Sequence, residues 1–135
     1  MSDAEPGKSR SIDLLIEECV RVSRLMGGDQ SLVLHGGGNT SVKAPFLDIT
    51  GTVIDTLYVK GSGWDLASME APGFAPLPLQ RMHALLELEQ LSDADMMREL
   101  SAARLDPVAP QPSVEALLHA YLPHQSVLHS HADLI

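Results

Sequence analysis

The sequence predicts an α/β domain in which helices are layered on a sheet, and the order of its residue patterns is the reason. An amphipathic helical pattern opens the chain, and two segments rich in β-branched residues and glycine follow. Helical patterns and a final apolar run typical of a strand come next. With 135 residues, of which 44% are hydrophobic, the chain is long enough for one folded domain. We expect residues 1–10 to form a flexible tail and residues 11–135 to form the domain.

The first helix is expected to begin at Ser11 and to end at the glycine pair 27–28. Apolar residues recur at helical spacing after Ser11, a serine can cap the first turn, and glycine is a common helix stop. The single cysteine, Cys19, lies on this apolar pattern and has no partner for an internal disulfide. We therefore expect a buried thiol there.

Strands are expected within 31–44 and within 51–67. Both segments combine β-branched residues with glycine clusters at which the chain can turn tightly. Residues 71–79 contain three prolines, which lack the N–H group that a sheet requires, so we expect a connector there.

Helices are expected around 79–90 and 93–104, the second of them capped by Ser92. After another proline-rich connector, a further helix is expected at about 113–121. The run SVLHSH at 126–131 then predicts a strand.

Charge and hydrophobicity exclude two classes of partner. A formal net charge of −9 argues against a nucleic acid, because a phosphate backbone requires clustered lysine and arginine. No apolar stretch approaches the roughly 18–20 residues that cross a bilayer, and the polar N-terminus lacks the apolar core of an export signal. We expect a cytoplasmic protein that acts on a small molecule.

Two glycine-rich stretches predict an anion site. HGGGNTSVK, residues 35–43, leaves backbone N–H groups open to a ligand and adds the polar side chains of Asn39, Thr40 and Ser41 and the charge of Lys43. VKGSGWDL, residues 59–66, has the same features: Lys60 comes before Gly61, and the hydroxyl residue Ser62 lies between Gly61 and Gly63. Each stretch alone is also typical of an ordinary hairpin turn, and that alternative stays open.

The stretch QPSVEALLH places three polar residues at a helix start. Ser113 is a candidate helix cap, and Glu115 lies in the first turn, where it either complements the helix dipole or acts on a ligand. His119 follows four residues later on the same helix face, where a structural hydrogen bond is its commonest use.

Two histidines in the final strand pattern predict a metal site. Residues at alternate positions of a strand point to one face, so His129 and His131 would present both imidazoles together. Such a pair suits a divalent metal ion, whereas a buried core histidine is the other interpretation.

Taken in order, GGGNTSVK, YVKGSGWDLA and PSVEALLHAYLPHQSVLHSHAD resemble the class II aldolase/adducin family. The resemblance runs from about Ile12 to the last residue. It is closest to the aldolase part of proteins in which that part is fused to a short-chain dehydrogenase and is linked to rhamnulose-phosphate cleavage. It implies a layered α/β/α domain with a central, mostly antiparallel sheet of which the C-terminal part is missing, in a parent protein that is a homo-oligomer.

The resemblance also implies roles for individual residues. The positions that match the family's phosphate-binding residues are Gly38, Asn39, Ser62, Gly63 and Ser113. Val114 stands where some aldolases have a second serine, so the fine geometry of that subsite differs. Glu115 matches the acid/base carboxylate, and His129 and His131 match the first two ligands of a catalytic zinc whose third histidine is expected downstream.

The implied reaction is metal-dependent cleavage of a ketose phosphate, such as rhamnulose 1-phosphate, to dihydroxyacetone phosphate and an aldehyde. Such a reaction needs a Lewis acid, a tuned carboxylate and a phosphate cradle for orientation. The alternatives are an epimerase or a dehydratase of the same fold, a non-catalytic module like the adducin head, and an inactive fragment.

Overall fold

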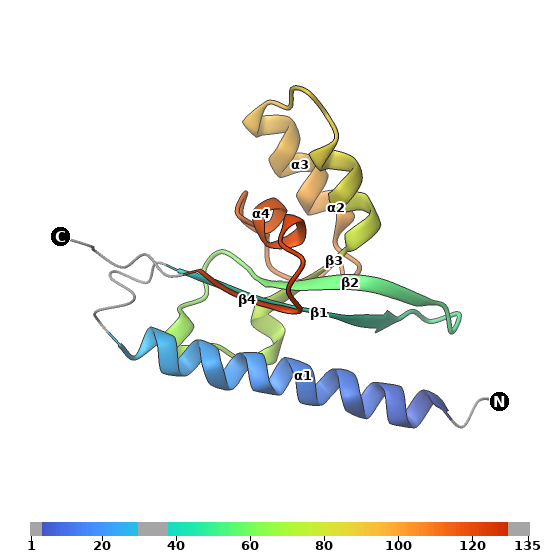
Figure 1. The fold of residues 1–135 in the computed structure, drawn as a ribbon, viewed down its shortest axis with the longest axis vertical. Coiled ribbons are helices and arrows are strands. Elements are labelled where there is room, and N and C mark those ends of the chain that lie inside the picture. The colour runs from blue at the N-terminus through green and yellow to red at the C-terminus, as the bar shows by residue number, and fades with distance from the viewer. Residues whose placement is uncertain (1–3, 30–37, 130–135) are drawn as a thin grey trace.

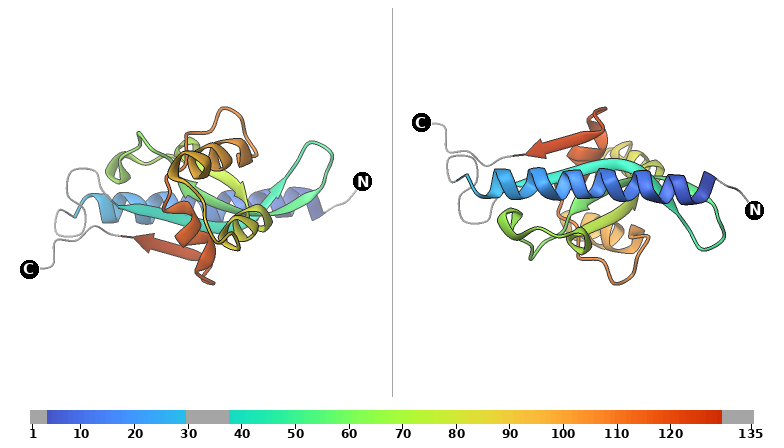
Figure 2. Two further views of the ribbon diagram at one scale, coloured as in Figure 1. Left: turned by 90° about the horizontal axis from the view of Figure 1, so that it is seen from above. Right: turned by 90° about the horizontal axis from the view of Figure 1, so that it is seen from below.

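The structure is a computed structural model that describes residues 4–29 and 38–129. It has three layers, with a four-stranded sheet in the middle, one long helix below it and three shorter helices above it (Figures 1 and 2). The helices are α1 (Ala4–Gly27), α2 (Leu79–Leu86), α3 (Asp93–Ala103) and α4 (Ala116–Tyr121). The strands are β1 (Asn39–Leu47), β2 (Val53–Lys60), β3 (Phe74–Pro78) and β4 (Ser126–His129), and two short 3-10 helices, η1 (Leu66–Ser68) and η2 (Ala71–Gly73), connect β2 to β3.

The sheet has the order β3-β2-β1-β4, and each neighbouring pair is antiparallel. β1 and β2 form a hairpin, whereas β4 returns from the far end of the described chain to pair with β1. The mostly antiparallel sheet expected from the sequence is confirmed.

Both faces of the sheet bury apolar side chains, because successive residues of a strand point to opposite faces. On the upper face, Leu57 and Val59 pack with residues of α2, α3 and α4. On the lower face, Val42 and Tyr58 pack with Cys19 and other residues of α1. The sheet is therefore held between two separate cores.

The first helix differs from its prediction at its beginning. α1 starts at Ala4 rather than at Ser11, so most of the segment 1–10, which we expected to be a tail, is helical. The polar N-terminal residues gave no apolar periodicity from which a helix could be read, and a helix can extend beyond the residues that it buries. Its end at Gly27 is confirmed.

The proline-rich connector predicted at 71–79 is wrong in its second half, which forms β3. Pro76 and Pro78 lie opposite Tyr58 and Thr56 at the edge of the sheet. The amide N–H of Leu105 donates to the carbonyl of Pro76 at 2.9 Å, so the main chain of Pro76 faces away from β2. An edge strand tolerates prolines at outward-facing positions, because no ladder hydrogen bond is lost there.

The helices above the sheet are close to their predicted positions. The Ser92 side chain accepts a hydrogen bond from the N–H of Asp95 at 3.1 Å, which confirms the predicted cap of α3. α4 begins at Ala116 rather than near Ser113, because residues 114–115 form a turn first. Within the described residues, no helix is long and apolar enough to cross a membrane.

The thiol of Cys19 provides a test of the lower core. Burial raises the pKa of this thiol to about 11, so at pH 8 only about one thiol in a thousand is ionised. We expect a thiol reagent to label Cys19 slowly in the native protein and fast in denaturant, as measured by mass spectrometry of the cysteine peptide. Rapid labelling of the native protein at pH 8 would contradict the packing of α1 on the sheet.

Candidate functional site

The site is built on the pairing of β1 with β4. Asn39 at the start of β1 lies opposite His129 at the end of β4. Directly opposite residues of an antiparallel pair project to the same face. The two side chains therefore lie together on the upper face of the sheet, although they are far apart in the sequence.

Glu115, at the N-cap position of α4, lies next to both of these residues. Its Oε1 atom accepts a long hydrogen bond of 3.4 Å from Nδ2 of Asn39, and its Oε2 atom lies 3.0 Å from Nδ1 of His129. The side chains of Glu115 and His129 are 28% and 32% exposed, so solvent and ligands can reach them. The structure thus brings together three of the residues that the sequence singled out.

The two glycine-rich stretches meet at the segment that precedes α4. The side-chain amide of Asn39 donates to Oγ of Ser113 at 3.2 Å, and the N–H of Ser62 donates to the carbonyl of Gln111 at 2.8 Å. Gly38 and Gly63 have φ angles of 95° and 87°. Glycine adopts this conformation without strain, so the chain can turn at both positions.

The side chains of three candidate phosphate ligands, Asn39, Ser62 and Ser113, have hydrogen bonds within the protein. Oγ of Ser62 donates to the carbonyl of Gln111 at 3.1 Å, and Nδ2 of Asn39 donates to Ser113 and Glu115. Oδ1 of Asn39 is buried, and no residue in the described part of the chain forms a hydrogen bond with it. In this arrangement Asn39 orients Glu115, and a bound anion would have to compete for its amide hydrogens.

Three polar residues of the first glycine-rich stretch do not line an anion site, contrary to the prediction. Thr40 lies on the lower face, with its Oγ1 atom 2.7 Å from Oγ of Ser23. Oγ of Ser41 lies 2.6 Å from Nδ1 of His119. Nζ of Lys43 donates to the carbonyls of residues 122 and 124 at 2.6 and 2.5 Å. Each bond joins β1 to a helix or to the chain that follows it, so their role is structural.

His119 is fully buried beneath the site, one helical turn after Glu115. Its ring centroid lies 6.0 Å from that of His129. Burial, followed by the charge of His129, lowers the pKa of His119 to about 4, so the imidazole is neutral at physiological pH. The structural hydrogen bond expected for this residue is confirmed by its contact with Ser41.

Lys60, at the end of β2, is a buried residue that is only 9% exposed. Its Nζ atom lies 3.4 Å from the carbonyl of Gly61, at the long limit of a hydrogen bond. Burial lowers the pKa of Lys60, while the carboxylates of Asp65 and Glu115 act in the opposite direction. Of the two lysines in the glycine-rich stretches, this one remains close to the site.

The donor atoms of Glu115 and His129 are of types found in zinc sites. His129 and Glu115 offer a nitrogen and an oxygen 3.0 Å apart, and both donor types bind zinc. Among residues 4–29 and 38–129, no group of three His, Cys, Asp or Glu side chains could hold a metal ion. The prediction for His131 lies outside the described residues. The described donors therefore fit part of a metal shell.

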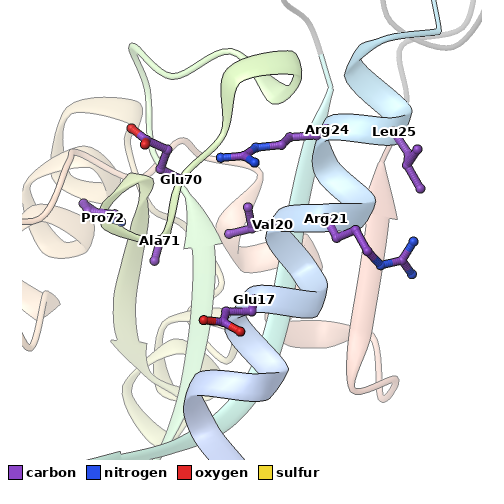
Figure 3. A pocket seen from close by; sticks show the side chains of 8 residues that line it. All are labelled: Glu17, Val20, Arg21, Arg24, Leu25, Glu70, Ala71 and Pro72. Atoms are coloured by element: carbon purple, nitrogen blue, oxygen red, sulfur yellow. The ribbon is translucent and has the colours of Figure 1, made fainter.

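A separate groove of about 650 Å³ lies between α1 and residues 70–72, on the other side of the sheet (Figures 1 and 3). Its rim carries two acidic and two basic side chains, and Arg21 is paired with Glu18. The Nε atom of Arg24 donates to the carbonyl of Met69 at 2.8 Å. The charges of the groove are thus of both signs, and its two arginines are bonded to other groups of the protein.

Comparison with known proteins shows which family has this architecture. The family described as "Class II Aldolase and Adducin N-terminal domain" matches residues 17–134. The chain belongs to this family. A solved structure from Thermoplasma acidophilum, described as the N-terminal class II aldolase domain of a conserved protein, is 43% identical with a TM-score of 0.83, and the likeness covers 87% of this chain and 55% of that chain. The likeness confirms the predicted fold.

A curated relative is much longer than the chain. The Bacillus subtilis (strain 168) protein named "Uncharacterized oxidoreductase YuxG" is 43% identical over 120 residues, which are 89% of this chain and 17% of that protein. The chain thus spans less than a fifth of this relative and about half of the solved one.

The bonds of Lys43 lead to a prediction for the class II aldolase domain itself. Replacing Lys43 by methionine removes two hydrogen bonds that hold the end of α4 and the start of β4 against β1. We expect the free energy of unfolding to fall by about 1–3 kcal/mol, measured by urea denaturation. Arg98→Met is the control, because Arg98 is paired with Asp95 on the exposed side of α3 and such pairs are worth about 0.3–0.5 kcal/mol. Equal losses in the two variants would contradict a structural role for Lys43.

Proposed function

We propose that the protein containing this domain is a metal-dependent aldolase that cleaves a phosphorylated ketose, such as rhamnulose 1-phosphate, to dihydroxyacetone phosphate and an aldehyde. The observation that carries the proposal is the meeting of Asn39, Glu115 and His129 on one face of the sheet. A carboxylate, an imidazole and a carboxamide at the ends of three elements form a polar centre, of which the carboxylate and the imidazole are partly exposed to solvent. Membership in the class II aldolase and adducin family supports this proposal.

His129 and His131 would hold the metal, most suitably Zn²⁺, together with a third histidine beyond this chain. When bound, the metal ion would act as a Lewis acid on the oxygens of the substrate next to the bond that breaks. Glu115, with one oxygen held by Asn39 and the other near His129, is placed to take a proton from the substrate or return it.

The phosphate group of the substrate would bind where the two glycine-rich stretches meet. Gly38 and Gly63 allow the backbone to turn there, and Asn39, Ser62 and Ser113 add polar side chains. The buried residue Lys60 adds positive charge nearby. This cradle would fix the substrate relative to Glu115, and orientation of this kind lowers the barrier substantially.

An epimerase or a dehydratase acting on a sugar phosphate is the second candidate. The same carboxylate, metal and phosphate residues would serve each of these reactions, so the assay must include their products. A short-chain dehydrogenase domain fused to this one and assembly as a homo-oligomer belong to the same proposal. The name of the longer Bacillus subtilis relative, an oxidoreductase, is consistent with such a fusion.

Replacing Glu115 by glutamine tests the acid/base role. The change keeps the size of the side chain but removes its charge and basicity, so we expect kcat to fall by about 10²–10⁴, with zinc largely retained by the histidines. The assay is turnover of rhamnulose 1-phosphate or a related ketose phosphate, with metal analysis of the same sample.

The control for this variant is Asp93→Asn, which removes a carboxylate from the first turn of α3. A carboxylate that only complements a helix dipole contributes about 0.3–1 kcal/mol to stability and nothing to turnover. If Glu115→Gln behaves like this control, the acid/base assignment is wrong. Loss of zinc together with activity would make Glu115 a metal ligand.

Replacing Asn39 by alanine separates the phosphate cradle from the orientation of Glu115. If Asn39 binds the phosphate group, KM should rise for a phosphorylated ketose and change much less for an unphosphorylated analogue. If its contact with Glu115 dominates, kcat should fall by a similar factor with both substrates. Steady-state kinetics with the matched substrate pair distinguishes the two results, and the second one removes Asn39 from the phosphate site.

A further inference from the structure

His119 is a buried polar residue for which the proposed reaction has no use. It is 0% exposed, and its Nε2 atom is buried with no hydrogen-bond partner among residues 4–29 and 38–129. An unpaired polar atom in a protein interior costs folding free energy, and an aliphatic side chain at this position would avoid that cost. The imidazole therefore requires an explanation other than packing.

The partner of His119 lies on the strand that forms the site. Nδ1 of His119 lies 2.6 Å from Oγ of Ser41, which is also fully buried. Ser41 is two residues after Asn39 on β1, so both side chains project to the upper face. On β4, Val127 lies opposite Ser41, and His129 lies opposite Asn39.

The Ser41–His119 contact is the middle member of a series of three. Asn39, Ser41 and Lys43 alternate along β1, and each bonds to a different part of the segment 113–124. Asn39 reaches the residues just before α4, Ser41 reaches the helix itself, and Lys43 reaches the chain just after it. Together these bonds fix the position of α4 on the sheet.

The position of α4 determines where Glu115 lies relative to His129. Glu115 immediately precedes the helix, and its main-chain carbonyl accepts a hydrogen bond from the N–H of His119 at 3.1 Å. His129, on the sheet, lies beside the imidazole of His119, with ring centroids 6.0 Å apart. A shift of α4 at His119 would therefore be transmitted to the carboxylate and would remove a neighbour of the His129 ring.

We propose that His119, through its hydrogen bond to Ser41, is a positioning residue that holds Glu115 against His129 and thereby sets the metal affinity of the site. Neither His119 nor Ser41 contacts the metal or the substrate in this assignment. The inference rests on the proposed function, because it takes His129 as a metal ligand. Residues that orient metal ligands commonly change metal affinity by 10- to 100-fold when they are replaced.

The lower face of β1 supplies a matched control. Thr40, the neighbour of Ser41, is equally buried, and its Oγ1 atom lies 2.7 Å from Oγ of Ser23 on α1. Thr40→Val and Ser41→Ala each remove one buried hydroxyl and one short hydrogen bond from the same strand, but only the second is on the side of the site. If both bonds serve folding alone, the two variants should behave alike.

The experiment uses the full-length protein and measures zinc affinity by competition with a chelating dye. We expect Ser41→Ala and His119→Leu to weaken zinc binding by about tenfold or more, and Thr40→Val to change it less than twofold. His119→Asn, which keeps a polar atom near the position of Nδ1, should recover most of the affinity. Thermal unfolding should show comparable losses of stability for Ser41→Ala and Thr40→Val.

Crystal structures of the metal-free variants provide a second readout that does not depend on zinc binding or turnover. The distance from Oε2 of Glu115 to Nδ1 of His129, 3.0 Å in this structure, should lengthen in Ser41→Ala and stay unchanged in Thr40→Val. An unchanged distance in Ser41→Ala, or equal zinc affinities in the Ser41 and Thr40 variants, would overturn the positioning role. Absence of ketose phosphate cleavage by the wild-type protein would instead refute the proposed function and leave these comparisons valid.

Discussion

The antiparallel pairing of β1 with β4 is the constraint on which the rest of the site depends. It places Asn39 opposite His129, although the two residues belong to distant parts of the chain. A shift of the register by one residue would move the His129 side chain to the lower face, because side chains alternate along a strand. The register is specified by Val127, which is buried in the structure, whereas its neighbours Leu128 and Ser126 are exposed.

Because side chains alternate along β1, this strand contacts the helices on both faces of the sheet. Its residues 40, 42 and 44 face the lower core, where two of them are apolar and the third bonds to Ser23. Its residues 39, 41 and 43 face the segment 113–124 and are all polar. Hydrophobic packing therefore attaches β1 to α1, whereas directional hydrogen bonds attach it to α4. Hydrogen bonds specify position more strictly than apolar contacts do, and the polar face is the one that carries the site.

Most of the fold could be predicted from local patterns, because apolar periodicity, caps and glycine stops depend on nearby residues. The end of α1 and the cap at Ser92 are examples. β3 was missed because its prolines are tolerated only at a sheet edge, and a local pattern does not reveal which strand will be an edge. Within the site, Glu115 and His129 were selected from their residue types and spacing. Lys43 instead donates to two main-chain carbonyls just after the end of α4. This contact depends on where α4 ends relative to β1, and a local sequence pattern cannot predict that position.

The prolines of β3 also affect whether a strand of another chain can pair with this edge of the sheet. An outer strand normally offers a row of N–H and C=O groups with which a foreign strand can pair, and this is a common route to aggregation. Pro76 and Pro78 have no N–H to offer, and the outward carbonyl of Pro76 is already bonded to Leu105. This margin of the sheet therefore disfavours strand addition, and among the described residues the opposite edge of the sheet is β4, which carries His129. Any strand that joins there, from the same chain or from another, would be a direct neighbour of the candidate metal ligand.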